Sequence, residues 1–366
     1  MIGDSATVLR GWLRPSALAA MATALFASPA AQASPTTTVQ SPPAASRFQE
    51  HPADVSIPDT RRISFASKVN GRTYLIDIAY PQFPQPKAGY PVIYVLDGNV
   101  YFASFTEAVR VNGNAPQAIV VGIGYPYFDP TWPATVLSKI KSLPTQMTDP
   151  SGVAFSLARF HDLTPTANDT LLKQMIGDGQ IFSRDDTGGV DDFLKVIETD
   201  VKPTVYAVAE ANHVQINRAD QTLFGHSLGG LAVIEAIFTE PKAFRTFIAA
   251  SPSIWWSDKA VLAKEAAFDT RVNAGDVSPR ILVTVGGDEE SVPSLPPALE
   301  ARRAEIEASQ KKNRMIGNAC DLVSRLKALH GAQGYEAADC AVFPQQDHGI
   351  SVWPAIGRAV SFAFPR

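Results

Sequence analysis

The chain has 366 residues, 45% of them hydrophobic, so it is long enough to bury the core of one large domain or two small ones. Its formal net charge is −4 and its lysines and arginines are scattered, which excludes the basic surface that nucleic-acid binding requires. The composition predicts a globular protein with no nucleic-acid partner.

Residues 1–33 have the pattern of an export signal. Arg10 and Arg14 precede the alanine-rich stretch "ALAAMATALFASPA", and the small-residue motif "AQA" ends at Ala33. A retained membrane anchor is the alternative, but the stretch is short for a span. We expect cleavage after Ala33, a periplasmic or secreted protein and no membrane span after processing. Residues 34–58 are rich in proline, serine and threonine, which predicts a disordered linker.

Residues 59–366 predict one α/β domain. The segment "RRISFASKVNGRTYLIDIAYP" predicts a hairpin, with a tight turn at Asn70-Gly71. The run "PVIYVLDG" is typical of a strand buried on both faces, and a helix over 102–111 and the strand "AIVVGIG" follow. The same order recurs from "TLFG" to the last helix, "AIGRAVSFAF". This alternation predicts a mostly parallel sheet with helices on both faces and an antiparallel hairpin at its edge.

The region from about 125 to 189 breaks this alternation. It contains six prolines at positions 126, 130, 133, 144, 150 and 165, and no clear strand. Long irregular segments in a compact domain are often lids or binding loops, so we expect a lid-like insertion; a surface excursion without a role is the alternative.

The two cysteines of the chain, Cys320 and Cys340, have nineteen residues between them. In an exported protein an isolated pair indicates a disulfide. Metal binding is the weaker interpretation, because two cysteines without a nearby histidine pair supply too few ligands for zinc.

The segment "GHSLG", residues 225–229, is a G-x-S-x-G motif between a predicted strand and a predicted helix. In that setting the motif turns sharply and presents its serine at the tip, so Ser227 is a candidate nucleophile. The glycines fit because the flanking backbones run too close together for a Cβ atom. A tight turn without chemistry is the alternative.

A serine nucleophile needs a base, and His348 is the candidate among the six histidines. It lies in "FPQQDHGIS", after the last predicted strand, where the base of such a fold occurs in chain order. A surface-loop histidine is the alternative. For the carboxylate that orients the base, "ILVTVGGDEES" offers Asp288, Glu289 and Glu290 directly after a strand, and the residues alone leave the choice open.

An oxyanion hole needs two backbone N–H groups. One should come from Leu228, the residue after the nucleophile. The other should come from the loop after an early central strand, where "YVLDGNVYF" offers Gly98 or Asn99. Asp97 is alternatively the cap of the helix that follows.

Seven segments carry a family resemblance, in the chain order "YPVIYVLDGNVYF", "VVGIGYP", "DLTP", "GGVDDFLKVIETDVKPTVY", "TLFGHSLGGL", "AASPSIWW" and "DHGIS". Together they resemble the esterase family that contains the enterobactin and salmochelin trilactone hydrolases. The resemblance covers nearly all of the chain from about residue 60. It implies an α/β-hydrolase fold and a serine hydrolase of ester bonds, with Ser227 as nucleophile and His348 as base. Residues 286–289 match the family's G-x-x-E acid loop, which favours Glu289, although a one-residue shift would select Asp288.

The resemblance also points to residues near the substrate. Because a ferric catecholate is strongly anionic, it suggests cationic side chains at the mouth, and Arg159, before "HDLTP", is the candidate. Trp255 and Trp256 either stack on an aromatic acyl group or fill the core. The side chain of His226 should point away from the site that Ser227 serves, so it is not the base, but it stays a candidate for substrate contact.

The sequence is compatible with three functions. The first is a periplasmic esterase that cleaves a catecholate siderophore lactone through an acyl-enzyme to aid iron release. The second is a general carboxylesterase or an acyltransferase of the esterase D type that uses the same residues. The third is a non-catalytic binding protein on the same fold. In each case the partner is a small molecule, and no cofactor or metal of the protein's own is expected.

Overall fold

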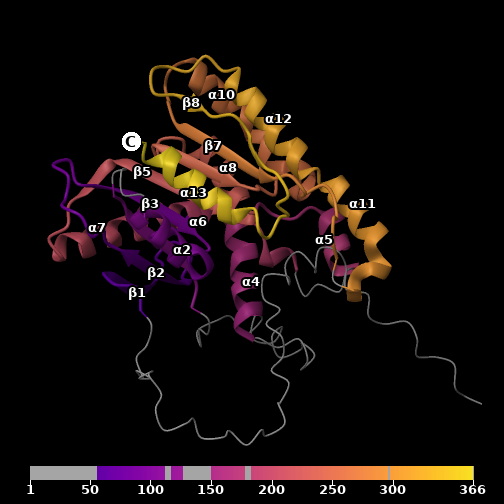
Figure 1. Cartoon of the computed structure of the whole chain (residues 1–366), viewed down its shortest axis with the longest axis horizontal. Coiled ribbons are helices and arrows are strands. Elements are labelled where there is room, and N and C mark those ends of the chain that lie inside the picture. The colour runs from indigo at the N-terminus through magenta and orange to yellow at the C-terminus, as the bar shows by residue number, and fades with distance from the viewer. Residues whose placement is uncertain (1–55, 112–116, 127–149, 178–182, 296, 366) are drawn as a thin grey trace, which may run out of the picture.

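The structure, a computed structural model, describes residues 56–111, 117–126, 150–177, 183–295 and 297–365 (Figure 1). Its strands are β1 (Thr60–Ala66), β2 (Thr73–Ala79), β3 (Tyr90–Leu96), β4 (Ile119–Gly124), β5 (Ile216–His226), β6 (Thr246–Ala250), β7 (Arg280–Gly286), β8 (Glu336–Ala337) and β9 (Ala341–Phe343). Within the described residues they form one sheet in the order β1-β2-β4-β3-β5-β6-β7-β8, and β9 also pairs with β7. The pairs β1/β2 and β2/β4 are antiparallel and the others are parallel, which confirms the predicted sheet with its antiparallel hairpin.

Helices cover both faces of the sheet, as Figure 1 shows. One face carries α2 (Gly98–Val111) and α13 (Val352–Ala363), which contact each other. The opposite face carries α4 (Pro150–Leu163), α6 (Val190–Val196), α7 (Lys202–Ala211), α8 (Leu228–Thr239), α10 (Glu265–Asn273) and α12 (Met315–Lys327). The remaining helical segments are α5 (Asp169–Gly177), η2 (Arg184–Asp186), the π-helical η3 (Ile197–Val201), α9 (Trp256–Lys259), η4 (Ala260–Lys264), η5 (Pro297–Arg302) and α11 (Arg303–Asn313).

The central strands divide their side chains between the two layers. On β3, Val92 and Tyr94 pack into the layer that contains α8, whereas Ile93 and Val95 pack against α2 and α13. This alternation follows from the two-residue period of a strand, and all seven residues of β3 are buried. Since β3, β5, β6 and β7 are parallel neighbours, the loops after them gather at one edge of the sheet.

The predicted two-residue turn at Asn70-Gly71 is wrong. The pairing of β1 with β2 ends at Ala66 opposite Thr73, so residues 67–72 form a six-residue connection. The carboxylate of Asp200 accepts hydrogen bonds from Ser67 Oγ (2.6 Å) and from the N–H of Lys68 (3.0 Å). These long-range hydrogen bonds stabilise the wider loop. The turn propensity of the Asn-Gly pair is a local property, so it cannot indicate them.

The described part of the region from 125 to 189 is largely helical, because α4, α5 and η2 lie in it. Phe155, Phe160 and Leu163 of α4 are buried in the core, and this apolar face makes the segment a helix of the main layer. Residues 127–149 and 178–182 lie outside the described residues, as do the predicted signal segment and most of the predicted linker.

Cys320 and Cys340 form the predicted disulfide, with their Cα atoms 5.3 Å apart. Cys320 lies on α12 and Cys340 immediately precedes β9, so the bond ties a surface helix to the last strand. Both cysteines are partly buried against the core. The twenty-residue separation closes a loop that the unfolded chain would otherwise leave open.

We predict that the double variant Cys320→Ser/Cys340→Ser unfolds more easily than the wild type. Closing a loop of this length stabilises a protein by about 3 kcal/mol in the chain-entropy description. Urea titration followed by circular dichroism should show this loss, and wild type treated with a reductant should show the same loss. An unchanged unfolding midpoint in both samples would contradict a stabilising role.

Candidate active site

The structure brings Ser227, His348 and Glu289 into one hydrogen-bonded chain. Nε2 of His348 lies 2.9 Å from Oγ of Ser227, and Nδ1 of His348 lies 2.7 Å from Oε2 of Glu289. Ser227 follows β5, Glu289 follows β7 by three residues, and His348 lies in the loop between β9 and α13. The geometry is that of a nucleophile, a base and an orienting acid.

Ser227 sits in a strained backbone conformation, with φ 60° and ψ −115°. Its N–H donates to the carbonyl of Ala250 (3.0 Å), which fixes the turn from β5 into α8. A Cβ atom at Gly225 would overlap the carbonyl of Gly229, so only glycine fits on that side of the turn. The sharp turn places the hydroxyl at the N-terminus of α8, where the helix dipole favours negative charge.

Glu289 is 1% exposed, yet its carboxylate is fully supported by hydrogen bonds. Besides His348, Oε1 accepts from Ser251 Oγ and from the N–H of Gly286, each at 2.6 Å. Burial alone would raise the pKa of Glu289, but His348, Ser251 and the Gly286 amide together hold it below its ordinary value. The carboxylate is therefore ionised at neutral pH. Its ionised form stabilises the folded protein at pH values above the unfolded-state pKa, and this stabilisation is lost as the pH falls through the lowered folded-state pKa.

The charge on Glu289 sets the proton positions on His348. An ionised carboxylate only accepts hydrogen bonds, so Nδ1 of His348 carries a hydrogen that it donates to Glu289. Nε2 is then free to accept the hydrogen of the Ser227 hydroxyl. This tautomer is the one that a general base requires.

Asp288, the alternative acid, has a different position. Its N–H donates to the carbonyl of Gln346 (3.0 Å) and its carbonyl accepts from the N–H of Ser291 (3.0 Å). The carboxylate that contacts His348 is that of Glu289. The structure thus separates two neighbours that the sequence alone leaves open.

The predicted oxyanion residues lie at the same edge of the sheet. Leu228 is the first residue of α8, and Gly98 and Asn99 are the first two residues of α2, after the neighbouring strand β3. A Cβ atom at Gly98 would lie 2.6 Å from the backbone of Gly122, so the backbone approaches β4 closely. The side chain of Asn99 exchanges two hydrogen bonds with the backbone of Tyr125, both 2.8 Å, which holds this turn in place. The oxyanion role of the three amides stays a prediction.

Arg159 lies next to the residue that precedes Ser227 and is engaged in an ion pair, and its contact with substrate stays a prediction. Its Nε donates to Oδ1 of Asp97 (2.8 Å) and its Nη2 donates to the carbonyl of His226 (3.3 Å). The side chain is 13% exposed and that of Asp97 is 2% exposed. Burial raises the pKa of Asp97, and Arg159 only partly opposes this rise. Burial alone would lower the pKa of Arg159, but the attraction of Asp97 outweighs burial and the pKa of Arg159 is raised. The arginine therefore joins the ends of β3 and β5, and Asp97 is an ion-pair partner.

The two tryptophans differ. Trp256 is 1% exposed and its Nε1–H donates to the carbonyl of Pro165 (2.8 Å), so substrate stacking is wrong for this residue and the core interpretation holds. Trp255 is partly exposed and packs on Trp256, with ring centroids 6.0 Å apart. It stays a candidate for substrate contact.

His226 is fully buried, so the predicted contact with substrate is wrong. Its Nε2 lies 3.0 Å from the carbonyl oxygen of His348 and its Nδ1 lies 3.2 Å from the hydroxyl of Tyr101. The sequence patterns do not identify Ser251 and Ser351, which contact Glu289 and the backbone of His348 respectively and lie 2.9 Å apart between their hydroxyl oxygens. For Ser251, a signal exists in the sequence: it is a polar residue directly after the buried strand "TFIAA".

No group of three or more histidine, cysteine, aspartate or glutamate side chains within the described residues could hold a metal ion. Among these residues there is also no helix long and apolar enough to cross a membrane.

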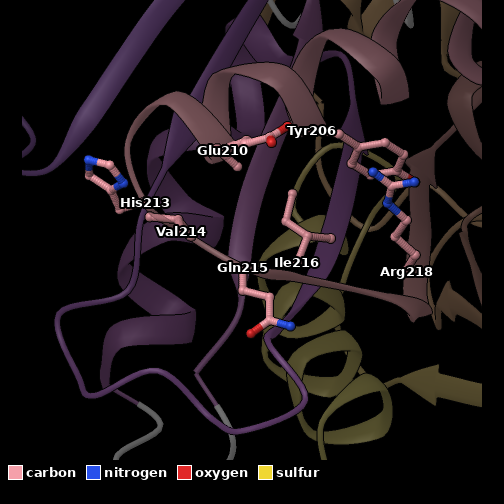
Figure 2. A pocket seen from close by; sticks show the side chains of 8 residues that line it. Tyr206, Glu210, His213, Val214, Gln215, Ile216 and Arg218 are labelled. Atoms are coloured by element: carbon pink, nitrogen blue, oxygen red, sulfur yellow. The ribbon is translucent and has the colours of Figure 1, made fainter.

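An open hollow lies between α7 and the start of β5 (Figure 2). The guanidinium of Arg218 lies over the ring of Tyr206 there, at 4.3 Å, and Glu210 and His213 line the same hollow. The hollow is at the amino end of β5, where Ile216 pairs with Tyr90 of β3, whereas Ser227 follows the carboxyl end of β5. It is separate from the candidate active site.

Comparisons with known proteins agree with this geometry. The "Putative esterase" family matches residues 183–338. The chain is 35% identical over 316 residues to the ferri-bacillibactin esterase BesA of Bacillus subtilis, which covers 84% of this chain and 90% of that protein. The chain belongs to this esterase family.

Two further matches extend the comparison. The esterase is 28% identical over 324 residues to a siderophore triacetylfusarinine C esterase of Aspergillus fumigatus, covering 86% and 96% of the two chains. The solved structure of the siderophore hydrolase EstB from Aspergillus nidulans superposes with a TM-score of 0.66 at 25% identity, covering 86% and 98%. The protein is an esterase that acts on carboxylic ester bonds, and it has the α/β-hydrolase fold.

We predict that Glu289→Gln lowers kcat by about 10²- to 10⁴-fold, because an amide can favour the wrong tautomer of His348. The matched control is Asp288→Asn, which removes the neighbouring charge without touching His348, and its kcat should stay within about twofold of the wild type. Initial rates with a p-nitrophenyl ester measure both variants. A large loss in Asp288→Asn with normal rates in Glu289→Gln would reverse the assignment.

Proposed function

We propose that this esterase hydrolyses the ester bonds of a siderophore lactone through an acyl-enzyme on Ser227. The observation that carries the proposal is the continuous chain of hydrogen bonds from Ser227 through His348 to the ionised Glu289. The siderophore class rests on the relatives, whose names state that they act on siderophores. Among such substrates we propose a catecholate trilactone of the enterobactin type.

The proposed reaction uses the site's residues in sequence. Nε2 of His348 takes the proton of Ser227 Oγ, which attacks the ester carbonyl carbon. The N–H of Leu228 and that of Gly98 or Asn99 donate to the oxyanion of the tetrahedral intermediate. As the ester C–O bond breaks, His348 gives its proton to the leaving alcohol.

Deacylation repeats these steps with water. His348 takes a proton from the water molecule that attacks the acyl carbon, and the proton returns to Ser227 Oγ as the second intermediate breaks down. Glu289 stabilises the imidazolium form of His348 in both halves and stays ionised throughout. The product is a carboxylate, and Ser227 is regenerated.

The test is a mass-spectrometric time course with ferric and iron-free enterobactin-type trilactone, comparing the wild type with Ser227→Ala. Linear trimer, dimer and monomer should appear with the wild type, and the variant should be slower by at least about 10³-fold. A p-nitrophenyl ester is the parallel substrate. If the ester is cleaved while both trilactones stay intact, the enzyme is a general carboxylesterase and the siderophore proposal is wrong.

We also propose that residues 1–33 direct export and are removed. Support comes from the basic and apolar pattern of this segment and from the Cys320–Cys340 disulfide, a bond typical of oxidising compartments. Cell fractionation with mass spectrometry of the N-terminus should find a periplasmic or secreted chain beginning at Ser34. The control variant Ala33→Leu should remain unprocessed, because cleavage needs a small residue. A wild-type chain that keeps residues 1–33 would contradict cleavage.

A further inference from the structure

His226 links the strand of the nucleophile to the loop of the base. It is 0% exposed, precedes Ser227 at the end of β5, and its Nε2 lies 3.0 Å from the backbone carbonyl oxygen of His348. The two imidazole rings are 4.9 Å apart between centroids, tilted by 36°. Ser227 and His348 are thus connected twice, once through their side chains and once through this neighbour.

The hydrogen positions on His226 follow from its surroundings. Burial lowers the pKa of His226 well below its ordinary value, and His348 and Arg159 lower it further, so the ring is neutral. A backbone carbonyl only accepts, so Nε2 carries the hydrogen and donates it to His348. Nδ1 then accepts the hydrogen of the Tyr101 hydroxyl, whose pKa is raised by burial.

The loop that carries His348 has little burial to hold it. Pro344, Gln345, Asp347, Gly349 and Ile350 are all exposed. Hydrogen bonds take over this role: the carbonyl of His348 receives both His226 Nε2–H and Ser351 Oγ–H, the latter at 3.2 Å. Of these two donors, only His226 comes from the buried sheet.

We propose that His226 is a positioning residue that sets the separation of the Ser227 hydroxyl from the His348 imidazole, by donating a hydrogen bond to the backbone of His348. The inference rests on the proposed roles of Ser227 and His348. A base displaced by about 1 Å from its partner loses rate by about 10²-fold, so a tether at this point has a kinetic effect.

A neutral donor also suits the charge changes of the reaction. The charged or titratable groups that face His226 are His348, the Arg159 guanidinium, Asp97 beyond it and the Tyr101 hydroxyl. Arg159 and Asp97 form an ion pair, and His348 becomes a cation during proton transfer. A cationic side chain at 226 would repel that cation, whereas neutral His226 donates its hydrogen bond without opposing it.

The experiment compares His226→Gln with His226→Met on a p-nitrophenyl ester. The amide nitrogen of glutamine can replace Nε2 as the donor to His348, whereas methionine has a similar volume and no donor. We expect His226→Met to lower kcat by about 10- to 100-fold with KM within about twofold of the wild type. His226→Gln should recover most of the loss, with circular dichroism and Tm alike for the two variants.

Two controls separate positioning from folding. Tyr101→Phe removes the donor to Nδ1 and leaves the bond to His348, so its kcat should stay within about threefold of the wild type. If His226→Met does not fold, His226→Asn takes its place, because the shorter amide reaches the Nδ1 position and not the His348 carbonyl. The kcat of His226→Asn should fall as far as that expected for His226→Met. The pH at which kcat/KM is half-maximal should also differ from the wild-type value in His226→Asn and match it in His226→Gln.

The inference is overturned if His226→Gln has the same kcat as His226→Met, or as His226→Asn where that variant replaces it. It is also overturned if both variants keep the wild-type kcat. The proposed function fails separately. The wild type and Ser227→Ala are assayed alongside. If Ser227→Ala turns over substrate like the wild type, the roles of Ser227 and His348 are refuted. If turnover requires Ser227 but does not change with the residue at 226, only the role of His226 is refuted.

Discussion

A carboxylate buried at the end of a parallel strand keeps its charge only if hydrogen bonds replace the water it has lost, and Glu289 meets that condition with three donors. Each donor comes from a different segment: the end of β7, the residue after β6, and the loop before α13. The bond that orients His348 therefore depends on the correct packing of neighbouring strands. The site is a property of the whole sheet edge.

A second buried charge organises the opposite side of the site. The Asp97–Arg159 pair joins the turn after β3 to α4, and Arg159 also reaches the carbonyl of His226. Both charges are almost removed from solvent, so neither can lose its partner without a large cost. Together with the bond from His226 to His348, this arrangement connects β3, β5 and the base loop behind the reactive hydroxyl.

Sequence patterns predicted those parts of the molecule that depend on local order. Strand and helix alternation indicated the sheet, and the strand-to-helix setting of "GHSLG" together with chain order singled out Ser227 and His348. The choice between Asp288 and Glu289 could not be made from the residues alone, because both follow the same strand and only the backbone path decides which side chain turns inward. For Glu289, the family resemblance carried the information.

The errors have a common physical origin. Trp256 and His226 are predicted near substrate because their residue types suit such contacts, yet each has a buried polar partner far along the chain. The loop at Asn70-Gly71 is similar, since its shape depends on Asp200. Composition and residue spacing indicate which secondary structure a segment prefers and which of its residues are buried. These contacts join residues that are far apart in the sequence, so they exist only after the chain has folded.

The two end strands of the described sheet are poorly suited to pair with another sheet. One side ends in β1, whose Arg61 and Arg62 are exposed, with Arg62 bound to Asp77 of β2. The other ends in β8 and β9, which are two and three residues long. A charged strand and a pair of very short ones offer a poor template for a further strand. As far as the described residues go, both end strands of the sheet therefore disfavour edge-to-edge aggregation.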